Sequence, residues 1–372
     1  MTDDMVRVAR RLADERLAPL AERIDREQQF SPELWRELFG FGLPAIPFPD
    51  ELGGAGATYL QYCDVVETIA RRCAVSTTYH APAVLVATAV ARYGQAELAR
   101  DLVPRIIAGQ TKACWAFTEP QTGSDPKQIA TRAVRRSNEW VIDGTKTFIT
   151  LGALADVALV FATTTDGRLS AILVDTHQAG WQAGEPFELL AFGGAATGPV
   201  FLDGVRAPAE HLIGPEGGGF EVMLRVEAAG KIRAAATCVG IAQRAQELAV
   251  DYASTRTHRG EAIGHKFDTI QWLLGEIGAS VEAARAITRE AARRHDEGAD
   301  VSRIAAAARI VTARAARTVT SDALQVFGSY GVVRGSEIER LYREGKFFEV
   351  GQGVVELQRL IVARSLLRER AG

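Results

Sequence analysis

The sequence lacks the residue patterns that mark several classes of protein. Its four cysteines are scattered without any close paired spacing, so they indicate neither a metal knuckle nor a disulfide framework, and we expect buried free thiols. The six histidines are dispersed and form no HExxH or comparable ligand pattern. We therefore expect no metal ion.

Long apolar runs and clusters of basic residues are also missing. No apolar run approaches the roughly 18 residues that a membrane span requires. The net charge is -3 and no segment concentrates Lys or Arg, which argues against a nucleic-acid binder. Residues 1–29 have the pattern of a charged amphipathic helix rather than of a secretion signal. These absences together predict a cytoplasmic protein with no membrane and no nucleic-acid partner.

The composition supports a large buried core. The 372 residues are enough for two or three domains or for one large helical assembly, and 47% of them are hydrophobic. The first third of the chain has apolar residues at helical spacing. In the stretch FSPELWRELFGFGL, Ser31 fits the N-cap of a helix, Pro32 its first turn and Gly40 its end.

The pattern changes twice along the chain. From residue 113, short segments rich in β-branched and aromatic residues are broken by Gly, Asp and Pro, as is typical of strands. From residue 216, the helical period returns in long Ala-rich stretches that suit a bundle. We predict a helical domain over 1–112, a β domain over 113–215 and a helical bundle over 216–372.

Two short motifs in the β domain could hold a ligand. In WAFTEPQTGSD, residues 115–125, a strand enters a Pro-Gly turn with the hydroxyls of Thr118 and Ser124 and free backbone N–H groups. In DGTKTFIT, residues 143–150, Phe148 can stack on a ring and Thr150 can donate a hydrogen bond. Each motif alone fits an ordinary turn or strand equally well. Together they suit an aromatic heterocycle with a polar edge.

Taken in this order, the motifs closely resemble those of the acyl-CoA dehydrogenase family. Three further stretches are similar to family patterns: FLDGVRAPAEHLIGPEGGGF, ALQVFGSYG and GQGVVELQRLIVAR. The resemblance covers nearly the whole chain. It implies an α+β, mostly α fold with an N-terminal helical domain, a middle β-barrel and a C-terminal four-helix bundle. It also implies FAD between the β domain and the bundle, in a homotetramer or homodimer.

The resemblance also assigns cofactor residues by position. Phe148 would pack on the isoalloxazine ring of FAD. Arg256 would reach across to a neighbouring subunit and contact the pyrophosphate of its FAD, although Arg256 considered alone also fits a solvated charge on a helix. The residues placed at the cofactor in this way are Trp115, Phe117, Thr118, Gly123, Ser124, Phe148, Thr150, Arg256, Gln325 and Gly328.

The implied reaction is α,β-dehydrogenation of an acyl-CoA or acyl-carrier-protein thioester, with electron-transfer flavoprotein or another acceptor as partner. In the family, a carboxylate removes the α-proton while a hydride leaves for the flavin. Here the family's catalytic glutamate falls on Gln352, and a second family position for the base falls on Gly230, followed by Lys231. Both positions lack a carboxylate. By position, Ser124, Lys231 and Gln352 would contact the substrate.

Four explanations for Gln352 remain open at this point. Glu227 or Glu349 could replace the base, although each also fits a structural or solvated charge. A malonyl-like thioester could form its own carbanion by losing CO₂, with Gln352 bonded to the thioester carbonyl or to the leaving carboxylate. The flavin could instead support a biosynthetic variant such as cyclisation or oxygenation. Finally, the chain could be the base-lacking partner subunit of a heteromeric dehydrogenase.

Overall fold

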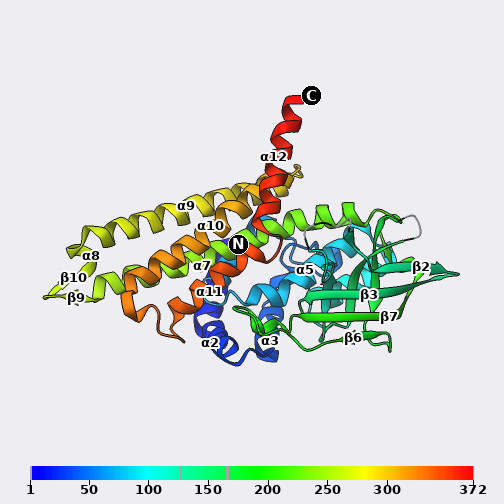
Figure 1. The fold of residues 1–372 in the computed structure, drawn as a ribbon, viewed down its shortest axis with the longest axis horizontal. Helices are drawn as coiled ribbons and strands as arrows, with labels where there is room; N and C mark the ends of the chain where they lie inside the picture. The colour runs from blue at the N-terminus through cyan, green and yellow to red at the C-terminus, as the bar shows by residue number, and fades with distance from the viewer. Residues whose placement is uncertain (1, 124, 126–127, 165–166, 372) are drawn as a thin grey trace.

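The computed structural model describes residues 2–123, 125, 128–164 and 167–371 of the chain. Figure 1 shows an elongated molecule in which long helices form one end and a β-sheet forms the other. The helices of the N-terminal segment pack between them. This arrangement confirms the predicted fold class of helical, β and helical parts in that order.

The N-terminal part is helical throughout. Its helices are α1 (Thr2–Leu12), α2 (Ala18–Glu27), α3 (Pro32–Gly40), α4 (Tyr59–Ala70), α5 (Ser76–Tyr93) and α6 (Ala96–Ile107), with a single π-helical turn, η1 (Ala13–Leu17), between α1 and α2. The limits of α3 are those predicted, because the Ser31 hydroxyl accepts a hydrogen bond from the Leu34 N–H at 3.2 Å. All four cysteines are buried and free, which confirms the expectation of unpaired thiols.

The middle part is one eight-stranded sheet. Its strands are β1 (Ala113–Ala116), β2 (Arg132–Arg136), β3 (Glu139–Ile149), β4 (Val157–Thr163), β5 (Leu169–Asp175), β6 (Trp181–Ala183), β7 (Gly198–Pro208) and β8 (Leu212–Ile213). Their order is β6-β7-β3-β2-β4-β5-β8, with β1 parallel to β4. The segment RAVRR, which forms β2, has no strand signature, because only Ala133 points into the core. Its antiparallel pairing with β3 makes it a strand.

The C-terminal part is a bundle of long helices. They are α7 (Gly219–Thr255), α9 (Asp268–Asp296), α10 (Ser302–Phe327) and α11 (Glu337–Val350), with the short α8 (Ile263–Lys266) and the hairpin of β9 (Thr257–His258) and β10 (Glu261–Ala262) at one end. Buried alanines such as Ala245, Ala284 and Ala316 let these helices approach closely. In the described part of the chain, no helix is both long and apolar enough to cross a membrane.

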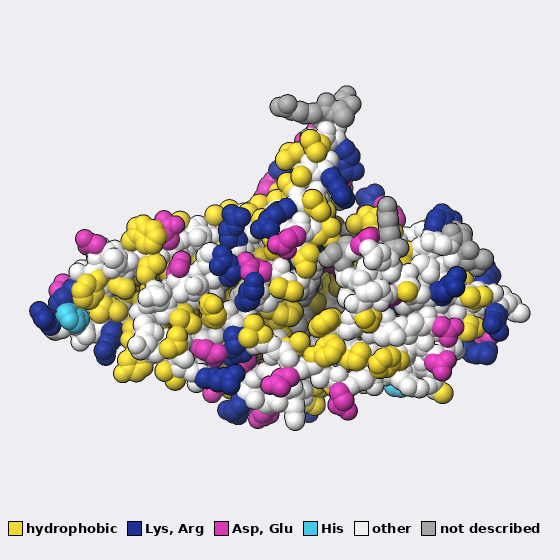
Figure 2. All heavy atoms as spheres, viewed as in Figure 1, with side chains coloured by type: hydrophobic (Ala, Val, Ile, Leu, Met, Phe, Trp, Pro, Cys, Tyr) yellow, Lys and Arg dark blue, Asp and Glu magenta, His cyan; other side chains and the backbone are white. Residues whose placement is uncertain are grey.

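The last helix, α12 (Val355–Ala371), stands away from the body of the molecule (Figure 1). Leu360, Leu366 and Leu367 on this helix are about half exposed or more, at 49%, 52% and 71%. Figure 2 shows hydrophobic side chains interspersed with basic ones along it. Apolar side chains on a projecting helix are typical of a surface that packs against another molecule.

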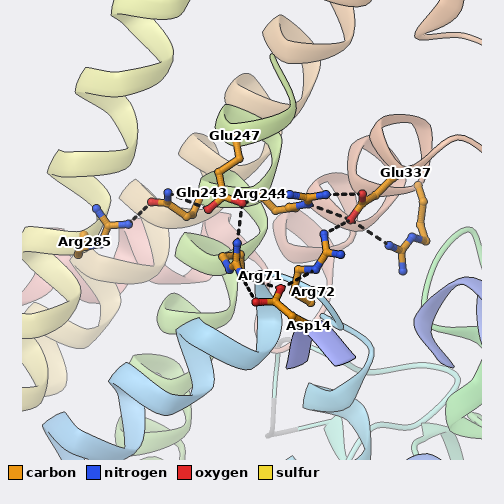
Figure 3. A network of polar contacts seen from close by, with 9 residues as sticks. Asp14, Arg71, Arg72, Gln243, Arg244, Glu247, Arg285 and Glu337 are labelled. Carbon is orange, nitrogen blue, oxygen red and sulfur yellow. Dashed lines mark hydrogen bonds and ion pairs between the residues drawn. The ribbon is translucent and has the colours of Figure 1, made fainter. Parts of the chain in front are cut away.

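A network of ion pairs joins the N-terminal helices to the bundle (Figure 3). Arg71, which caps α4, contacts Asp14 at 2.7 Å and Glu247 of α7 at 2.8 Å. Glu337, the first residue of α11, receives two bonds from Arg244 at 3.0 and 2.8 Å. Arg72 and Arg285 extend the network to Asp14, Glu337 and Gln243. Because all of its members except Asp14 are half-buried, solvent screens most of these pairs less than surface pairs.

Removing the Glu337 carboxylate should loosen this junction. We expect Glu337→Gln to lower the free energy of unfolding by about 1.5–3 kcal/mol, because two charge-assisted bonds to Arg244 are lost. Burial works to raise the pKa of Glu337, but the bonds and charges of Arg244 and Arg72 outweigh it and leave the pKa below its ordinary value. A carboxyl group with a lowered pKa contributes stability above its unfolded pKa of about 4.5, and this is lost as the pH falls through the folded value.

Urea midpoints of the wild type and the variant, measured from pH 7 down to pH 3, check both statements. The difference between the two proteins should shrink as the pH falls below about 4.5. Glu221→Gln, which breaks an exposed pair with Arg225, is the matched control and should change stability by under about 0.5 kcal/mol. A Glu337 effect no larger than that of Glu221 would contradict the prediction.

Candidate active site

A buried ion pair locks the two motifs of the β domain together. Lys146 Nζ donates to Glu119 Oε1 at 2.8 Å and to the carbonyls of Phe117 and Phe161 at 3.1 and 2.6 Å. Both charged side chains are almost completely buried. Burial lowers the pKa of Lys146 to about 8, against the opposing charge of Glu119. Glu119 and Lys146 therefore join the two motifs to each other, and their charges are used in this contact.

The strand that carries Phe148 presents an aromatic surface. Phe148 is 59% exposed, has a left-handed φ of 54° and lies 4.9 Å from the ring of Phe187. Thr150 Oγ1 and Thr197 Oγ1 lie 3.3 Å apart beside it. An exposed aromatic face next to two hydroxyls fits a planar heterocycle with a polar edge, as an isoalloxazine is.

The other residues predicted in this region have varied surroundings. Trp115 and Phe117 are half-buried and pack on Phe161, with ring centroids 4.8 and 5.3 Å from it. Thr118 is half-buried and its carbonyl accepts from the Thr147 N–H at 2.9 Å, and Gly123 is exposed in the turn. Ser124 lies outside the described residues.

The residues predicted for the distal half of FAD lie elsewhere. Arg256 ends α7, and its guanidinium lies 5.9 Å from the centre of the Tyr330 ring. Gln325 and Gly328 are exposed near the end of α10, in the segment that leads to Tyr330. The adjacent β9/β10 hairpin and the sheet occupy opposite ends of the molecule (Figure 1). One chain therefore brings Arg256 together with the Gly328 segment but not with Phe148.

The loop between α11 and α12 holds Gln352 in a defined conformation. Gln352 has a left-handed φ of 55°, which is uncommon outside glycine. A Cβ at Gly351 would lie 2.6 Å from the Phe347 ring, so a larger residue there would require that ring to shift. Arg309 of α10 donates to the carbonyls of Phe348 and Gly351 at 2.9 and 3.1 Å. The backbone on the N-terminal side of Gln352 is therefore anchored from the bundle.

Arg233 of α7, which sequence reasoning missed, holds the side chain of Gln352. Its guanidinium is 2% exposed, donates to Gln352 Oε1 at 2.7 Å and also bonds the Thr77 hydroxyl. An arginine can only donate, so the amide oxygen of Gln352 is the atom engaged. The amide N–H₂ group is left as a donor and has no partner among the described residues. The available signal was a lone arginine in the small-residue run IRAAATCVG.

The two candidate substitute bases differ in their surroundings. Glu349 is paired with Lys346 at 2.7 Å and with Arg317 at 2.8 Å. Glu227 is half-buried and has neither a hydrogen bond nor an ion pair within the described part of the chain. Its Oε2 lies 3.5 Å from the place a Cβ would take at Gly230, the second family position for the base.

Burial shapes the charge state of Glu227 and of Lys231, one helical turn later. It raises the pKa of Glu227 above the ordinary value, against the charges of Lys231, Arg233 and Arg309. It lowers the pKa of Lys231, against the charge of Glu227. A carboxylate in such surroundings is a stronger proton acceptor than one in water. The arrangement can therefore remove a weakly acidic proton.

Three family models match the chain in order. They describe the N-terminal, middle and C-terminal domains of acyl-CoA dehydrogenase and match residues 2–110, 114–205 and 217–367. The cyclohexane-1-carbonyl-CoA dehydrogenase of Geobacter metallireducens is 34% identical over 100% of this chain and 99% of its own. The acryloyl-CoA reductase (NADH) of Anaerotignum propionicum is 32% identical over 97% of this chain and 93% of its own.

A solved structure gives the same result. The butyryl-CoA dehydrogenase of Megasphaera elsdenii superposes with a TM-score of 0.95 at 28% identity, over 98% of each chain. The family models, the relatives and the solved structure cover nearly the whole chain and agree with the family that the motifs indicate. The chain belongs to the acyl-CoA dehydrogenase family of FAD-dependent oxidoreductases.

Proposed function

We propose that this chain oxidises an acyl thioester between its α and β carbons, with Glu227 as the base. The observation that supports it is the Glu227 carboxylate, unpaired and partly desolvated beside Gly230. FAD, when bound, accepts the hydride from the β-carbon. Phe148, Thr118 and Thr150 would hold its ring system.

The protein's part of the reaction is to place the substrate and to take one proton. The α C–H bond breaks, its proton passes to a Glu227 oxygen, and its electron pair forms the new double bond as the β-hydride leaves. The products are an enoyl thioester, a protonated Glu227 and a two-electron-reduced cofactor. The charge of Lys231, one turn away, favours the ionised form of Glu227 before the step.

Several finer features belong to the same proposal. We place Arg256, Gln325 and Gly328 at the FAD of a neighbouring copy, since β3, the strand that carries Phe148, lies at the other end of the molecule. The apolar side chains of α12 support a homodimer or homotetramer. The electron acceptor would be electron-transfer flavoprotein or a similar protein, the thioester would be carried by CoA or a carrier protein, and the setting would be cytoplasmic. We keep the domain limits at 112/113 and 215/216.

Gln352 supports a second candidate function. Arg233 binds the amide oxygen of Gln352 and leaves the amide N–H₂ as a donor at the position of the family base. Neither family position for the base carries a carboxylate. A variant reaction of biosynthesis, such as decarboxylation of an activated thioester, would need no base there. A base-lacking partner subunit would bind FAD and show no turnover alone.

One absorption experiment separates these functions. Acyl thioesters, plain and α-carboxylated, are added anaerobically to the purified FAD-loaded protein, and the flavin band near ~450 nm is followed. Bleaching is expected. A flavin that stays oxidised while the thioester is consumed would support redox-neutral chemistry. If the flavin is not bleached and the thioester is not consumed, and if turnover appears when a base-carrying homologue is added, the result would support the partner subunit.

Restoring the family residue should not by itself improve the reaction. We expect Gln352→Glu to change the rate of flavin reduction by less than about tenfold. Arg233, 2.7 Å from the side chain, would pair with the new carboxylate, lower its pKa and weaken it as a base. Stopped-flow absorbance measures the rate. A gain of about 100-fold would show that position 352, not Glu227, meets the α-proton.

A further inference from the structure

We propose that the acyl group of the substrate carries a carboxylate, which the charge of Arg233 and the amide N–H₂ of Gln352 hold beside the thioester. The inference rests on the proposed function, because it names the substrate class of the same site. It comes from an excess of buried positive charge around Gln352.

Among the described residues, three buried cations lie near this site and outnumber the acidic side chains that interact with them. Arg233, Arg309 and Lys231 are 2%, 0% and 9% exposed. Within the described residues none of the three lies within ion-pair distance of an acidic side chain. Among the described residues, Glu227 is a carboxylate that interacts with all three at longer range. Gln352 is a neutral acceptor for Arg233. The site therefore carries a net positive charge in a partly desolvated place.

Other buried cations of the chain are paired. Lys146, 0% exposed, lies 2.8 Å from Glu119, and Arg340, 7% exposed, lies 3.8 Å from Glu344. Buried charges are rare without a partner, because burial removes the water that stabilises them. Arg233, Arg309 and Lys231 depart from that rule, and they do so near Gln352, where the family places its catalytic base. An anionic ligand would restore the balance.

The unused donors point to a carboxylate as that anion. Arg233 Nε is buried and has no hydrogen-bond partner in the described structure. The amide N–H₂ of Gln352 likewise has no partner among the described residues, while the amide oxygen accepts from Arg233. Gln352 is half-buried and Arg233 is 2% exposed, so Gln352 is the more accessible of the two bonded side chains. Donors of this kind recognise the two oxygens of a carboxylate, whereas a plain alkyl chain would leave them unsatisfied.

The test compares thioesters that differ by one group. Succinyl-CoA and butyryl-CoA differ by a carboxylate in place of the terminal methyl, and methylmalonyl-CoA and isobutyryl-CoA differ in the same way at the α-carbon. Dissociation constants are measured from the shift of the flavin spectrum of the FAD-loaded protein at equilibrium. We expect the carboxylated member of at least one pair to bind about tenfold or more tightly.

Variants assign that preference to Arg233. Arg233→Met should reduce it to under about threefold, and Arg233→Lys should keep most of it. Arg225→Met removes an exposed arginine from the same helix and should leave the preference unchanged. If Arg233→Met fails to retain FAD, Gln352→Leu, which removes only the amide, should also lower the preference.

Equal or tighter binding of both neutral members by the wild type would overturn the inference, as would a preference that survives Arg233→Met. A third result also overturns it: Arg233→Met slows flavin reduction equally for neutral and carboxylated thioesters. That result would mean that the charge of Arg233 stabilises the enolate of any substrate. The binding preference is read whether or not the flavin is reduced. A failure of the proposed oxidation is therefore distinguishable from a failure of this inference.

Discussion

Glu227→Gln is expected to slow flavin reduction by an acyl thioester by about 10²–10⁴-fold, with little change in the affinity for the thioester. The variant keeps the size of the side chain and its place beside Gly230, and it loses only the ability to accept a proton. Anaerobic stopped-flow measurement at 450 nm gives the rate, and the flavin spectrum gives the affinity.

The pH dependence of the same rate gives independent evidence. Burial raises the pKa of Glu227, so the wild-type rate should rise with pH as this carboxyl group ionises, at a pH above the ordinary glutamate value. In Glu227→Gln that rise should disappear. A simple loss of packing would reduce the rate at every pH and keep the profile.

Glu349→Gln is the matched control for Glu227→Gln. It makes the same chemical change in the other candidate base, which already pairs with Lys346 and Arg317. We expect its rate to stay within about threefold of the wild type. The reverse pattern, with Glu349→Gln slow and Glu227→Gln normal, would make Glu349 the base and refute the assignment to Glu227.

Glu119→Gln is expected to lower the free energy of unfolding by about 3–5 kcal/mol. Its carboxylate is the charged partner of the buried Lys146 ammonium, and it also accepts the backbone N–H groups of Ala130 and Thr131 at 2.7 and 3.0 Å. Without it, Lys146 keeps a buried charge with only two carbonyl acceptors. Breaking one partner of a buried pair is costly for this reason.

The double variant Glu119→Gln with Lys146→Met separates the cost of an uncompensated charge from the loss of hydrogen bonds. The double variant should be more stable than Glu119→Gln alone, because the buried Lys146 charge is removed together with the carboxylate that compensates it. Glu139→Gln, which breaks the exposed pair with Arg206, should cost under about 0.5–1 kcal/mol. Urea midpoints of the FAD-loaded proteins provide the comparison. Equal losses for Glu119→Gln and Glu139→Gln would contradict the structural role given to the pair.

Local patterns in the sequence were enough to predict much of the fold. Ser31, Pro32 and Gly40 mark the limits of α3 because helix capping depends on a few neighbouring residues. Strand β2 was missed because its sequence is mostly charged and its pairing with β3 is a tertiary effect. The motif match located Gln352 and Glu227 but not their surroundings.

Contacts between distant segments explain what was missed at the site. Arg233 and Gln352 are 119 residues apart in the sequence, and nothing local to either residue indicates their contact. Glu119 and Lys146 are 27 residues apart in two separate motifs, and neither motif indicates that the two side chains form an ion pair. The separation of Arg256 from Phe148 likewise depends on the length and direction of α7, which a motif does not give.

The anchoring of the Gln352 loop by Arg309 has a mechanical consequence. Both carbonyls that Arg309 binds precede Gln352, and both are tied to α10 rather than to α12. The segment before Gln352 is therefore held by the bundle, and the first turn of α12 also packs there, since Val355 and Gln358 are buried. A neighbouring molecule that displaces the exposed part of α12, around Leu366 and Leu367, would act beyond this buried first turn. The contacts that hold Gln352 would stay in place during such a displacement.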